Sequence, residues 1–400
     1  MLIPTNKEIY SSLKNQLALD FNCNPEDFDK TENVITLPAL NEGRRVFSNE
    51  KFFLQIATLG DNAVISADEK LHPWLNEWVK GKTGFWLFEQ HNYFELENQV
   101  RKFGYKMALT HHMFLPLPEL VPVEPDFEYC FIETEEIMQY YGRPELPNAI
   151  CNCYKPERPD VLAVLALSNE NTTANSSQAL TYKGKKIMGM AGCSADSKKF
   201  WQIGIDVLPE YRRRGIGTAL VKLLRNETFL RGAIPYYGTS LSNLRSWKIA
   251  LASGFKPAWV EAETRKMKYF RVHTSDVAWI TQKPRGIFTS VGKLVDAKIL
   301  TPEETAEYWK QREYFEKVLP VPPFYDKGNP DHAVTWFKDT PQGNDIWNQL
   351  TFYRQMCAKY GLKLYRSETS EIPGEIIYED DFQIAVKNEK ADLKVEVSEI

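Results

Sequence analysis

Apolar and polar residues alternate along the first quarter of the chain with the spacings of both helices and strands. Thr5 and Glu8 have the spacing of a helix capping box, and apolar residues follow them on one helix face. Two apolar runs, 52–58 and 63–67, flank the turn sequence Gly60-Asp61-Asn62, which predicts a β-hairpin. After the hairpin, the pattern predicts a helix, a strand and a helix at about 71–79, 85–88 and 93–102.

The middle of the chain predicts several strands followed by alternating helices and strands. Apolar segments predict three strands before the first helix, at 161–167, 186–193 and 201–207. A polar stretch at 168–178, rich in Asn, Thr and Ser, predicts a loop between the first two. The remaining elements are expected in the order helix, strand, helix, strand, at 217–231, 233–237, 246–253 and 257–264.

Prolines and changes of pattern divide the chain into three predicted domains. Four prolines within 116–125 cannot lie inside a helix or a central strand, so they predict an extended linker. In the last region, Thr301 to Glu304 predicts a capped helix, and a second helix is expected at about 345–360. Segments 375–378 and 382–386 predict a hairpin there. The expected domains are an N-terminal α/β domain, a central domain and a C-terminal α+β domain, at 1–115, 126–272 and 285–400.

Composition excludes several classes of function. The 400 residues are 43% apolar, which is enough for packed cores, and the net charge of −4 gives no general attraction to nucleic acid or acidic membranes. No stretch approaches the ~20 apolar residues of a membrane span. The N-terminus also lacks the pattern of a signal peptide, so we expect a cytoplasmic protein without nucleic-acid or membrane partners.

The cysteines and histidines do not predict a metal site. The six cysteines are scattered, and free thiols are expected. Cys151 and Cys153 could begin a metal site, but no second pair has the spacing of zinc ligands. His111 and His112 belong to an apolar run at 107–115 and are expected to be structural or surface residues. We therefore expect no bound metal.

The most specific functional pattern begins where the strand ending at Val207 meets a basic turn. Gly215-Ile216-Gly217 follows the turn, and a helix follows the glycines. A helix N-terminus presents free backbone N–H groups and the positive end of the helix dipole, worth about 0.3–1 kcal/mol to a nearby anion. Glycine lets phosphate approach the backbone closely. Positive charge around the turn comes from Arg212, Arg213 and Arg214. The run therefore predicts a pyrophosphate-binding turn.

Two common nucleotide-binding loops do not fit this run. A dinucleotide-binding fingerprint needs a third glycine where Leu220 stands, and a P-loop needs Gly-Lys-Ser or Gly-Lys-Thr. The run Arg212-Arg213-Arg214-Gly215-Ile216-Gly217 instead resembles the signature of the GNAT superfamily of acyl-CoA-dependent N-acyltransferases. A second mark of that superfamily, an Asn before a short helix and then Gly-Phe, is matched by Asn243 and Gly254-Phe255. The resemblance covers about 126–270.

The resemblance implies a GNAT-type mixed twisted sheet flanked by helices, with acetyl-CoA as co-substrate and no metal. In GNAT proteins the backbone N–H at the position of Val207 polarises the acyl carbonyl, and the Asn at the position of Asn243 contacts the pantetheine arm. Removing such a carbonyl donor typically lowers the rate about 10²–10³-fold. The implied cofactor-binding residues are Val207, Arg212, Arg213, Arg214, Gly215, Ile216, Gly217, Thr218, Asn243 and Ser246.

The general acid departs from the GNAT pattern. Many GNAT proteins carry a Tyr seven residues after the motif Asn, where this chain has Ala250. The nearest phenols in sequence are Tyr236 and Tyr237, on the adjacent short strand. Of the two, Tyr237 is the predicted catalytic acid, although a tyrosine packed in the core is the ordinary alternative for both.

The general base is predicted among nearby carboxylates, which contribute about 10²–10⁴-fold in such a role. Asp206 is the first candidate because it precedes the position of the carbonyl donor. Asp196 is a second candidate, with capping of the following turn as its alternative role. Glu261 and Glu263 alternate on a late strand and are expected on the solvated surface.

Together these features predict an acetyltransferase that moves an acetyl group directly from acetyl-CoA to a primary amine of a small molecule or peptide. Two alternatives stay open: a CoA-binding sensor or structural pseudoenzyme, which Ala250 favours, and a transferase of longer acyl or aminoacyl groups. A homodimer is also left open. The N-terminal domain is predicted to be a degenerate GNAT-like half, because Gly104-Tyr105-Lys106 echoes Gly254-Phe255-Lys256 after a helix.

Overall fold

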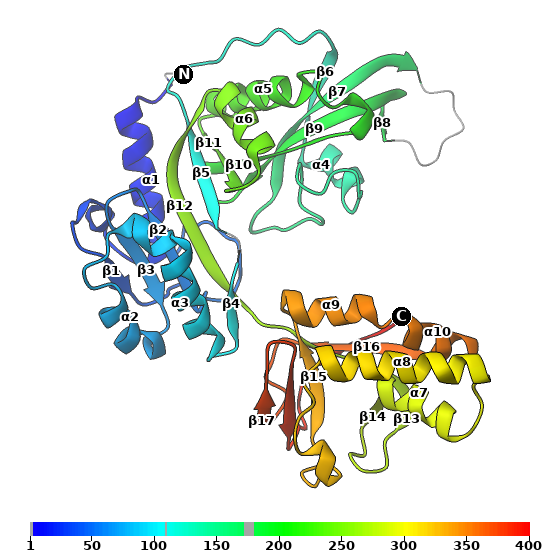
Figure 1. The fold of residues 1–400 in the computed structure, drawn as a ribbon. Helices are drawn as coiled ribbons and strands as arrows, with labels where there is room; N and C mark the ends of the chain where they lie inside the picture. Colours follow the sequence, from blue (N-terminus) through cyan, green and yellow to red (C-terminus); the bar gives the residue numbers. More distant parts are fainter. Residues whose placement is uncertain (1–2, 109, 172–179) are drawn as a thin grey trace. The chain divides into compact units, whose positions relative to one another are not determined.

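The computed structural model describes residues 3–108, 110–171 and 180–400, which fold into two compact units (Figure 1). The N-terminal unit comprises residues 1–100 and 107–265, and the C-terminal unit comprises residues 101–106 and 266–400. Helices and strands alternate through both units. The mixed α/β class predicted from the sequence is therefore confirmed.

A continuous sheet runs through the N-terminal unit, with the strand order β1-β3-β2-β12-β5-β11-β10-β9-β7-β6. A short additional strand, β8, pairs with β9. The bounds of these strands are β1 (Val34–Thr36), β2 (Leu54–Thr58), β3 (Ala63–Ala67), β5 (His111–Pro116), β6 (Glu128–Glu133), β7 (Asp160–Asn171), β8 (Thr181–Tyr182), β9 (Lys185–Ala195), β10 (Phe200–Val207), β11 (Ile234–Ser240) and β12 (Phe255–Lys266). The strand β4 (Tyr105–Met107) spans the boundary between the two residue ranges. The strands and helices predicted for the central region are all present.

The N-terminal and central segments share this sheet because of strand β5. It lies between β11 and β12 and pairs antiparallel with both, through Phe114 opposite Tyr237 and Pro116 opposite Phe255. Strand β12 then continues past β5 and pairs with β2, with Val260 opposite Thr58. The structure thus differs from the predicted division between residues 1–115 and 126–272, because both segments contribute strands to one compact unit.

Short-range predictions for the N-terminal segment agree with the structure except at one place. β2 and β3 form the expected hairpin. Residues 85–88, predicted as a strand, instead belong to a 3₁₀ helix, η3 (Gly84–Phe88), so that prediction is wrong. Gly84 donates its N–H to the carbonyl of Asp61, and a Cβ at Gly84 would lie only 2.2 Å from the Asn62 backbone. This close packing holds the segment in a turn that a short apolar run does not reveal. The hypothesis of a degenerate GNAT-like half stays a prediction.

Helices pack on both faces of the sheet. The capping box at Thr5 starts α1 (Asn6–Phe21), whose apolar side packs with Tyr236 and Trp259. On the opposite face, α5 (Ile216–Leu230) and α6 (Leu244–Ala252) pack with Tyr237. The smaller helices of this unit are η1 (Pro25–Asp29), η2 (Glu69–Leu71), α2 (His72–Trp78), η3 (Gly84–Phe88), α3 (Gln90–Arg101), α4 (Thr134–Ile137), η4 (Met138–Tyr140) and η5 (Pro209–Tyr211).

The predicted proline-rich linker is anchored to α5. Residues 117–127 contain no helix or strand, as expected. Arg225 is fully buried and donates from its two terminal nitrogens to the carbonyls of Leu117, at 2.6 Å, and Glu119, at 2.9 Å. Asn226 accepts from the N–H of Val121 at 3.0 Å. The predicted polar loop at 168–178 begins within β7, and its residues from 172 onward lie outside the described residues.

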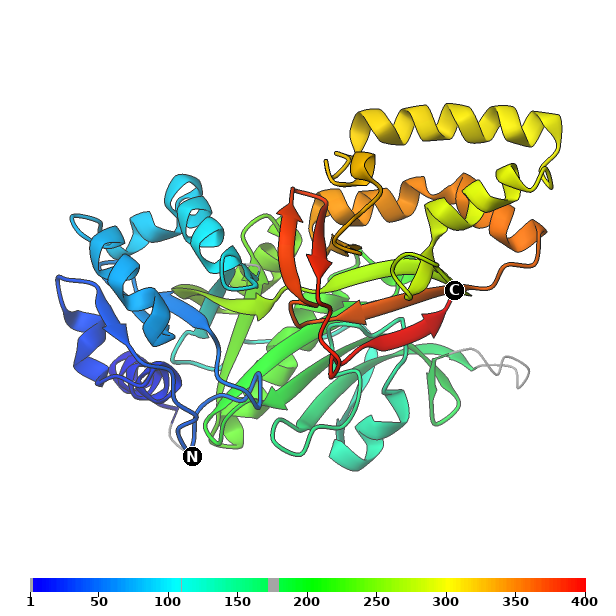
Figure 2. The same cartoon turned by 90° about the horizontal axis from the view of Figure 1, so that it is seen from below.

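The C-terminal unit is a separate sheet with helices along one side (Figure 2). Its strand order is β17-β18-β15-β13-β16-β19, and β14 pairs with β13. The capped helix and the hairpin predicted here are confirmed, whereas the helix predicted at 345–360 is divided in two at Leu350. The elements are β13 (Tyr269–Val277), β14 (Pro284–Gly286), α7 (Ile287–Asp296), α8 (Pro302–Val318), η6 (Tyr325–Lys327), β15 (Val334–Lys338), α9 (Pro341–Gln349), α10 (Thr351–Lys359), β16 (Leu364–Thr369), β17 (Glu375–Glu379), β18 (Gln383–Lys387) and β19 (Glu396–Glu399).

Candidate active site

The basic turn leads directly into the N-terminus of α5. Gly215 precedes the helix with φ = 79°, and Arg213 has φ = 64°, so the turn contains two left-handed residues. The first helical hydrogen bond of this helix runs from the N–H of Ala219 to the carbonyl of Gly215. The backbone N–H groups of Ile216, Gly217 and Thr218 therefore have no partner in the helix and can receive an anion.

The turn and the first residues of α5 lie against the end of β10. Arg212 donates from Nε to the carbonyl oxygen of Val207 at 2.9 Å. A Cβ on Gly217 would lie 3.4 Å from Cγ2 of Val207 and 3.5 Å from Cδ1 of Ile249. These are ordinary van der Waals distances, so glycine leaves room for a methyl group but not for a longer side chain without displacement. The side chains of Arg212, Arg213 and Arg214 are exposed.

Strands β10 and β11 separate beside this turn. They pair in parallel only as far as Ile203 opposite Tyr237. Beyond that pair, β10 continues along β9, with Val207 opposite Gly189, while β11 continues along β5. The parallel strands therefore open at the end that faces the N-terminus of α5.

The N–H of Val207 points toward the opened side. Leu208 donates its N–H to the carbonyl of Met188 on the β9 side, at 3.0 Å. Because N–H groups alternate in direction along an antiparallel strand, the N–H of Val207 points away from β9. The predicted position for a carbonyl donor thus has the required orientation.

Tyr237 connects this region to α6. Its hydroxyl lies 2.7 Å from Oγ of Ser246, and the N–H of Ser246 donates to Oδ1 of Asn243, the N-cap of α6, at 3.2 Å. Tyr237 is only 2% exposed, and burial raises the pKa of its phenol, which stays protonated near neutral pH. Ala250 is fully buried in the same apolar cluster.

Comparison with known proteins decides the family of this region. Residues 144–255 match the model of the acetyltransferase (GNAT) family. These residues form a GNAT acetyltransferase domain. The match includes the basic turn, α5, β11 and α6, and it supports acyl transfer as the general chemistry. No curated protein matches the sequence.

Solved structures similar to this chain include several GNAT proteins. A GNAT-family acetyltransferase from Novosphingobium aromaticivorans is 13% identical over 40% of this chain and 66% of its own, with a TM-score of 0.30. A GCN5-related N-acetyltransferase-like protein from Streptococcus suis is 16% identical over 53% and 83%, with a TM-score of 0.32. One from Sphaerobacter thermophilus is 13% identical over 66% and 94%, with a TM-score of 0.34. This chain thus spans just under two thirds of the length of the first of these proteins. TM-scores this low carry no argument about substrates.

Asp206 anchors a loop of the GNAT domain. Its carboxylate accepts from the N–H groups of Asn148 and Ala149, both at 2.7 Å, and from Nδ2 of Asn148 at 2.8 Å. The loop lies so close to the sheet that a Cβ on Gly204 would be 1.8 Å from the Asn148 carbonyl oxygen. Three donors already occupy the carboxylate, so the geometry favours an anchoring role over the predicted role as base.

Asp196 and Tyr236 belong to a buried polar network on the other face of the sheet. Asp196 is fully buried and accepts hydrogen bonds from Arg158, from the Tyr236 hydroxyl and, at 2.7 Å, from Oγ of Ser194. Tyr236 packs against Trp259 in the core beneath α1. Neighbouring residues of a strand point to opposite faces, so Tyr236 and Asp196 lie away from Tyr237.

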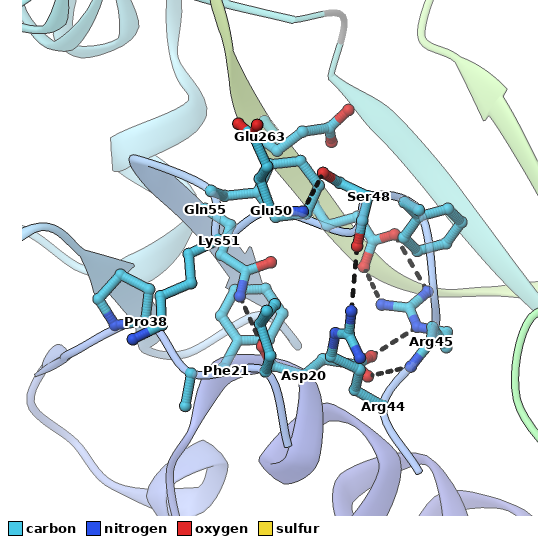
Figure 3. Close-up of a pocket in the computed structure, with 16 residues that line it drawn as sticks. Asp20, Phe21, Pro38, Arg44, Arg45, Ser48, Glu50, Lys51, Gln55 and Glu263 are labelled. Atoms are coloured by element: carbon cyan, nitrogen blue, oxygen red, sulfur yellow. Dashed lines mark hydrogen bonds and ion pairs between the residues drawn. The ribbon is translucent and has the colours of Figure 1, made fainter. Parts of the chain in front are cut away.

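The expectation of a solvated Glu261 is wrong. Glu261 is 9% exposed, and its two oxygens accept from the guanidinium of Arg45 at 2.7 and 3.1 Å. Figure 3 shows Arg45 held on its other side by Asp20, at 2.6 Å. Burial and the charge of Glu261 raise the pKa of Glu263. Glu261 is buried because β2 pairs with β12, which makes β12 an interior strand.

The small pocket around Arg45 does not have the size of a substrate site. Its volume is about 40 Å³, and Asp20 and Arg45 are among its lining residues (Figure 3). Ligand pockets usually measure about 300–1,000 Å³. We therefore interpret this cluster as a structural charge network that attaches the loop around Arg45 to β12.

The sequence did not indicate a role at the site for three residues near Tyr237, which are His112, Thr239 and Trp247. His112 on β5 lies opposite Thr239 of β11, and its ring centroid is 5.2 Å from that of Trp247. Within the described residues, Oγ1 of Thr239 and Nε1 of Trp247 are buried without a hydrogen-bond partner. Burial lowers the pKa of His112, which favours the neutral imidazole. Only the insertion of β5 beside β11 brings these residues together, and local sequence patterns do not reveal such an insertion.

Two further observations concern the described residues only. No cluster of three or more His, Cys, Asp and Glu residues in them has the arrangement of a metal site. None of the described helices has the length and apolar character needed to cross a membrane.

Proposed function

We propose that this protein transfers an acetyl group from acetyl-CoA to a primary amine of a small molecule or peptide. The observation that carries the proposal is the unpartnered helix start of α5 beside the opened end of β10 and β11. Anions are favoured at such a helix start, and the opened strands leave a backbone N–H for the acyl carbonyl.

The donor would bind along the predicted residues of the GNAT domain. The N–H groups of Ile216, Gly217 and Thr218 would receive the pyrophosphate, with the exposed arginines of the turn supplying positive charge. The exposed Asn243 lies at the start of α6, where its amide nitrogen is available to the pantetheine arm. The N–H of Val207 would hold the thioester carbonyl oxygen as negative charge develops on it.

Transfer in this arrangement is direct. The neutral amine attacks the thioester carbon, a C–N bond forms, and the C–S bond breaks to release CoA thiolate. Tyr237 would donate its proton to the thiolate and regain one through Ser246, whose hydroxyl is 2.7 Å away. The amine proton would leave to water, because the carboxylate of Asp206 is already occupied by three donors.

A CoA-binding protein without turnover is the second candidate, and Ala250 is the observation that favours it. This residue fills the core position where many GNAT proteins carry their acid, so activity depends on Tyr237 taking that role. A transferase of longer acyl or aminoacyl groups is the third candidate. Homodimerisation and a cytoplasmic location stay predictions from the sequence.

Thiol release tests these candidates together. The full chain is incubated with acetyl-CoA and a panel of primary amines, comprising diamines, amino sugars and lysine-containing peptides, while free CoA is detected colorimetrically. The proposal predicts amine-dependent CoA release and a product heavier by one acetyl group. Binding of acetyl-CoA without release for any amine would favour the second candidate. Faster release from decanoyl-CoA than from acetyl-CoA would favour the third.

A further inference from the structure

The C-terminal unit contains a cavity of about 890 Å³. Its lining comes from β13, β14, α7, α8, the proline-containing loop after α8, and β15. This volume lies within the range of about 300–1,000 Å³ that small-molecule sites occupy. The predicted acetyl transfer does not use this cavity, because the donor site belongs to the GNAT domain.

The wall of this cavity is largely apolar and aromatic. It includes Ile287, Phe288, Phe315, Phe337 and Tyr353, which belong to the main core cluster of this unit. The cavity is open to solvent at its outer part. Covering the apolar surface of such a wall contributes about 25 cal/mol per Å². An apolar ligand is therefore the favoured occupant.

The apolar surface extends to the outer part of the cavity lining. Trp279 is 87% exposed, Val321 is 53% exposed and Ile280 is 43% exposed, and all three line the cavity. Large apolar side chains that gather at a concave surface mark binding sites more often than ordinary surface. These three side chains form the rim over which an apolar ligand would enter.

One arginine in the lining, Arg271, forms no ion pair within the described residues. Arg271 donates from Nη2 to the carbonyl of Pro284 at 2.9 Å, and its guanidinium lies 5.8 Å from the ring centroid of Trp336. Within the described residues no carboxylate forms an ion pair with Arg271. The nearby Glu389 is held instead by Lys283, at 2.6 Å, and by Nε1 of Trp336, at 3.0 Å. Burial lowers the pKa of Arg271, and the charge of Glu389 opposes this shift without cancelling it.

The other arginines of the lining differ from Arg271 in this respect. Arg285 lies 3.4 Å from Asp276, and Arg312 lies 2.9 Å from Glu316. Their charges are thus compensated within the protein. A guanidinium without a carboxylate prefers a ligand that supplies one, because two parallel N–H bonds can be made to it.

We propose that the C-terminal unit binds a long-chain carboxylate, with its head group at Arg271 and its chain among the aromatic residues of the cavity. The inference goes beyond acetyl transfer and does not depend on it. The size of the cavity, its apolar wall and the one arginine of its described lining without an ion pair support the same ligand class.

Calorimetric titration of the full chain with laurate, below its micelle concentration, tests the head group. Dodecanol serves as the uncharged comparison ligand. Wild-type protein should bind laurate saturably, with one site per chain. Arg271→Gln should weaken laurate about tenfold or more, as expected for a charge-assisted pair, and should change dodecanol affinity little. Lys310→Gln makes the same charge change on α8 outside the cavity, where Lys310 pairs with Glu307, and should leave both affinities unchanged.

A second variant tests the chain-binding part of the cavity. Gly292 on α7 lines the cavity, and a Cβ there would lie 3.1 Å from the hydroxyl of Tyr308. Gly292→Leu should fill the space and weaken laurate and dodecanol together by about tenfold or more. Two results would overturn the proposal: no saturable laurate binding by the wild-type chain, or laurate affinity that neither Arg271→Gln nor Gly292→Leu lowers.

Discussion

The adjacent residues Tyr236 and Tyr237 of β11 lie on opposite faces of the N-terminal sheet, and the buried polar groups around them differ in how completely they are satisfied. On the α1 face, Tyr236 donates to Asp196, which also accepts from Arg158 and Ser194. On the α6 face, the Tyr237 hydroxyl has one hydrogen-bond partner in the described residues, Oγ of Ser246, and Thr239 has a buried hydroxyl with none. Buried polar groups are nearly always paired in folded proteins. The network around Tyr236 therefore stabilises the fold, whereas the groups near Tyr237 keep hydrogen-bonding capacity that the proposed donor site could use.

The largest expected effect comes from removing Arg45, which pairs with two buried carboxylates. Arg45→Met would leave Asp20 and Glu261 buried without their partner, because Arg45 bonds both. Such a loss typically costs about 3–5 kcal/mol of unfolding free energy. Chemical denaturation measures this change. Lys14→Met removes a partly exposed ion pair with Asp29 and should cost far less. Equal stability of the two variants would contradict a structural role for Arg45.

The next effect concerns the opposite face at Gly217. A Glu side chain there must displace Val207 or Ile249, and its charge repels phosphate, so Gly217→Glu should weaken acetyl-CoA binding about 100-fold or more. Gly217→Ala adds only a methyl group at ordinary contact distance and should keep most of the affinity. Calorimetry measures affinity, and circular dichroism checks the fold. Undiminished affinity in a folded Gly217→Glu variant would remove the phosphate site from α5.

The adjacent tyrosines give the sharpest form of the comparison. Tyr237→Phe should lower kcat about 10–100-fold while acetyl-CoA affinity stays nearly constant, because only the acid is lost. Tyr236→Phe should leave kcat unchanged and lower stability by roughly 1–3 kcal/mol, because Asp196 loses a buried donor. Steady-state kinetics with an amine from the thiol-release panel, together with thermal unfolding, separates the two effects. The same kinetic response for both tyrosines would end the distinction between the faces.

The smallest effect is a pH dependence at His112. Burial lowers the pKa of His112 in the folded protein, so the unfolded chain takes up the proton first as the pH falls. The contribution of His112 to stability is therefore present above the ordinary histidine pKa of about 6.5 and is lost as the pH falls below it. His112→Gln should flatten the stability profile between pH 7 and pH 5, measured by denaturant unfolding. An unchanged profile would show that His112 does not titrate differently on folding.

Local chemistry made part of this structure predictable from the sequence. The capping box at Thr5, the β2–β3 hairpin and the start of α5 at Gly215 each depend on a few neighbouring residues. The backbone of the basic turn was predictable for the same reason, since it depends on one short run, and its binding of phosphate stays a prediction. Asn243 also caps α6 as predicted.

Long-range pairing made the rest unpredictable. The position of β5 between β11 and β12 brings His112 beside Trp247, although they are far apart in the sequence. The same topology buries Glu261, which pairs with the distant Arg45. Periodicity reports which side of a strand is apolar, but it does not report which strand lies next to it. The hydrogen-bond partners of Asp206 come from a distant loop for the same reason.

Calorimetric titration of the full chain with acetyl-CoA tests the central claim most directly, with free CoA and ATP as comparison ligands. The account predicts saturable binding of acetyl-CoA and CoA at one site per chain, with ATP binding much more weakly because it lacks the pantetheine arm. No binding of acetyl-CoA, or ATP binding as tight as that of CoA, would contradict a donor site at the N-terminus of α5.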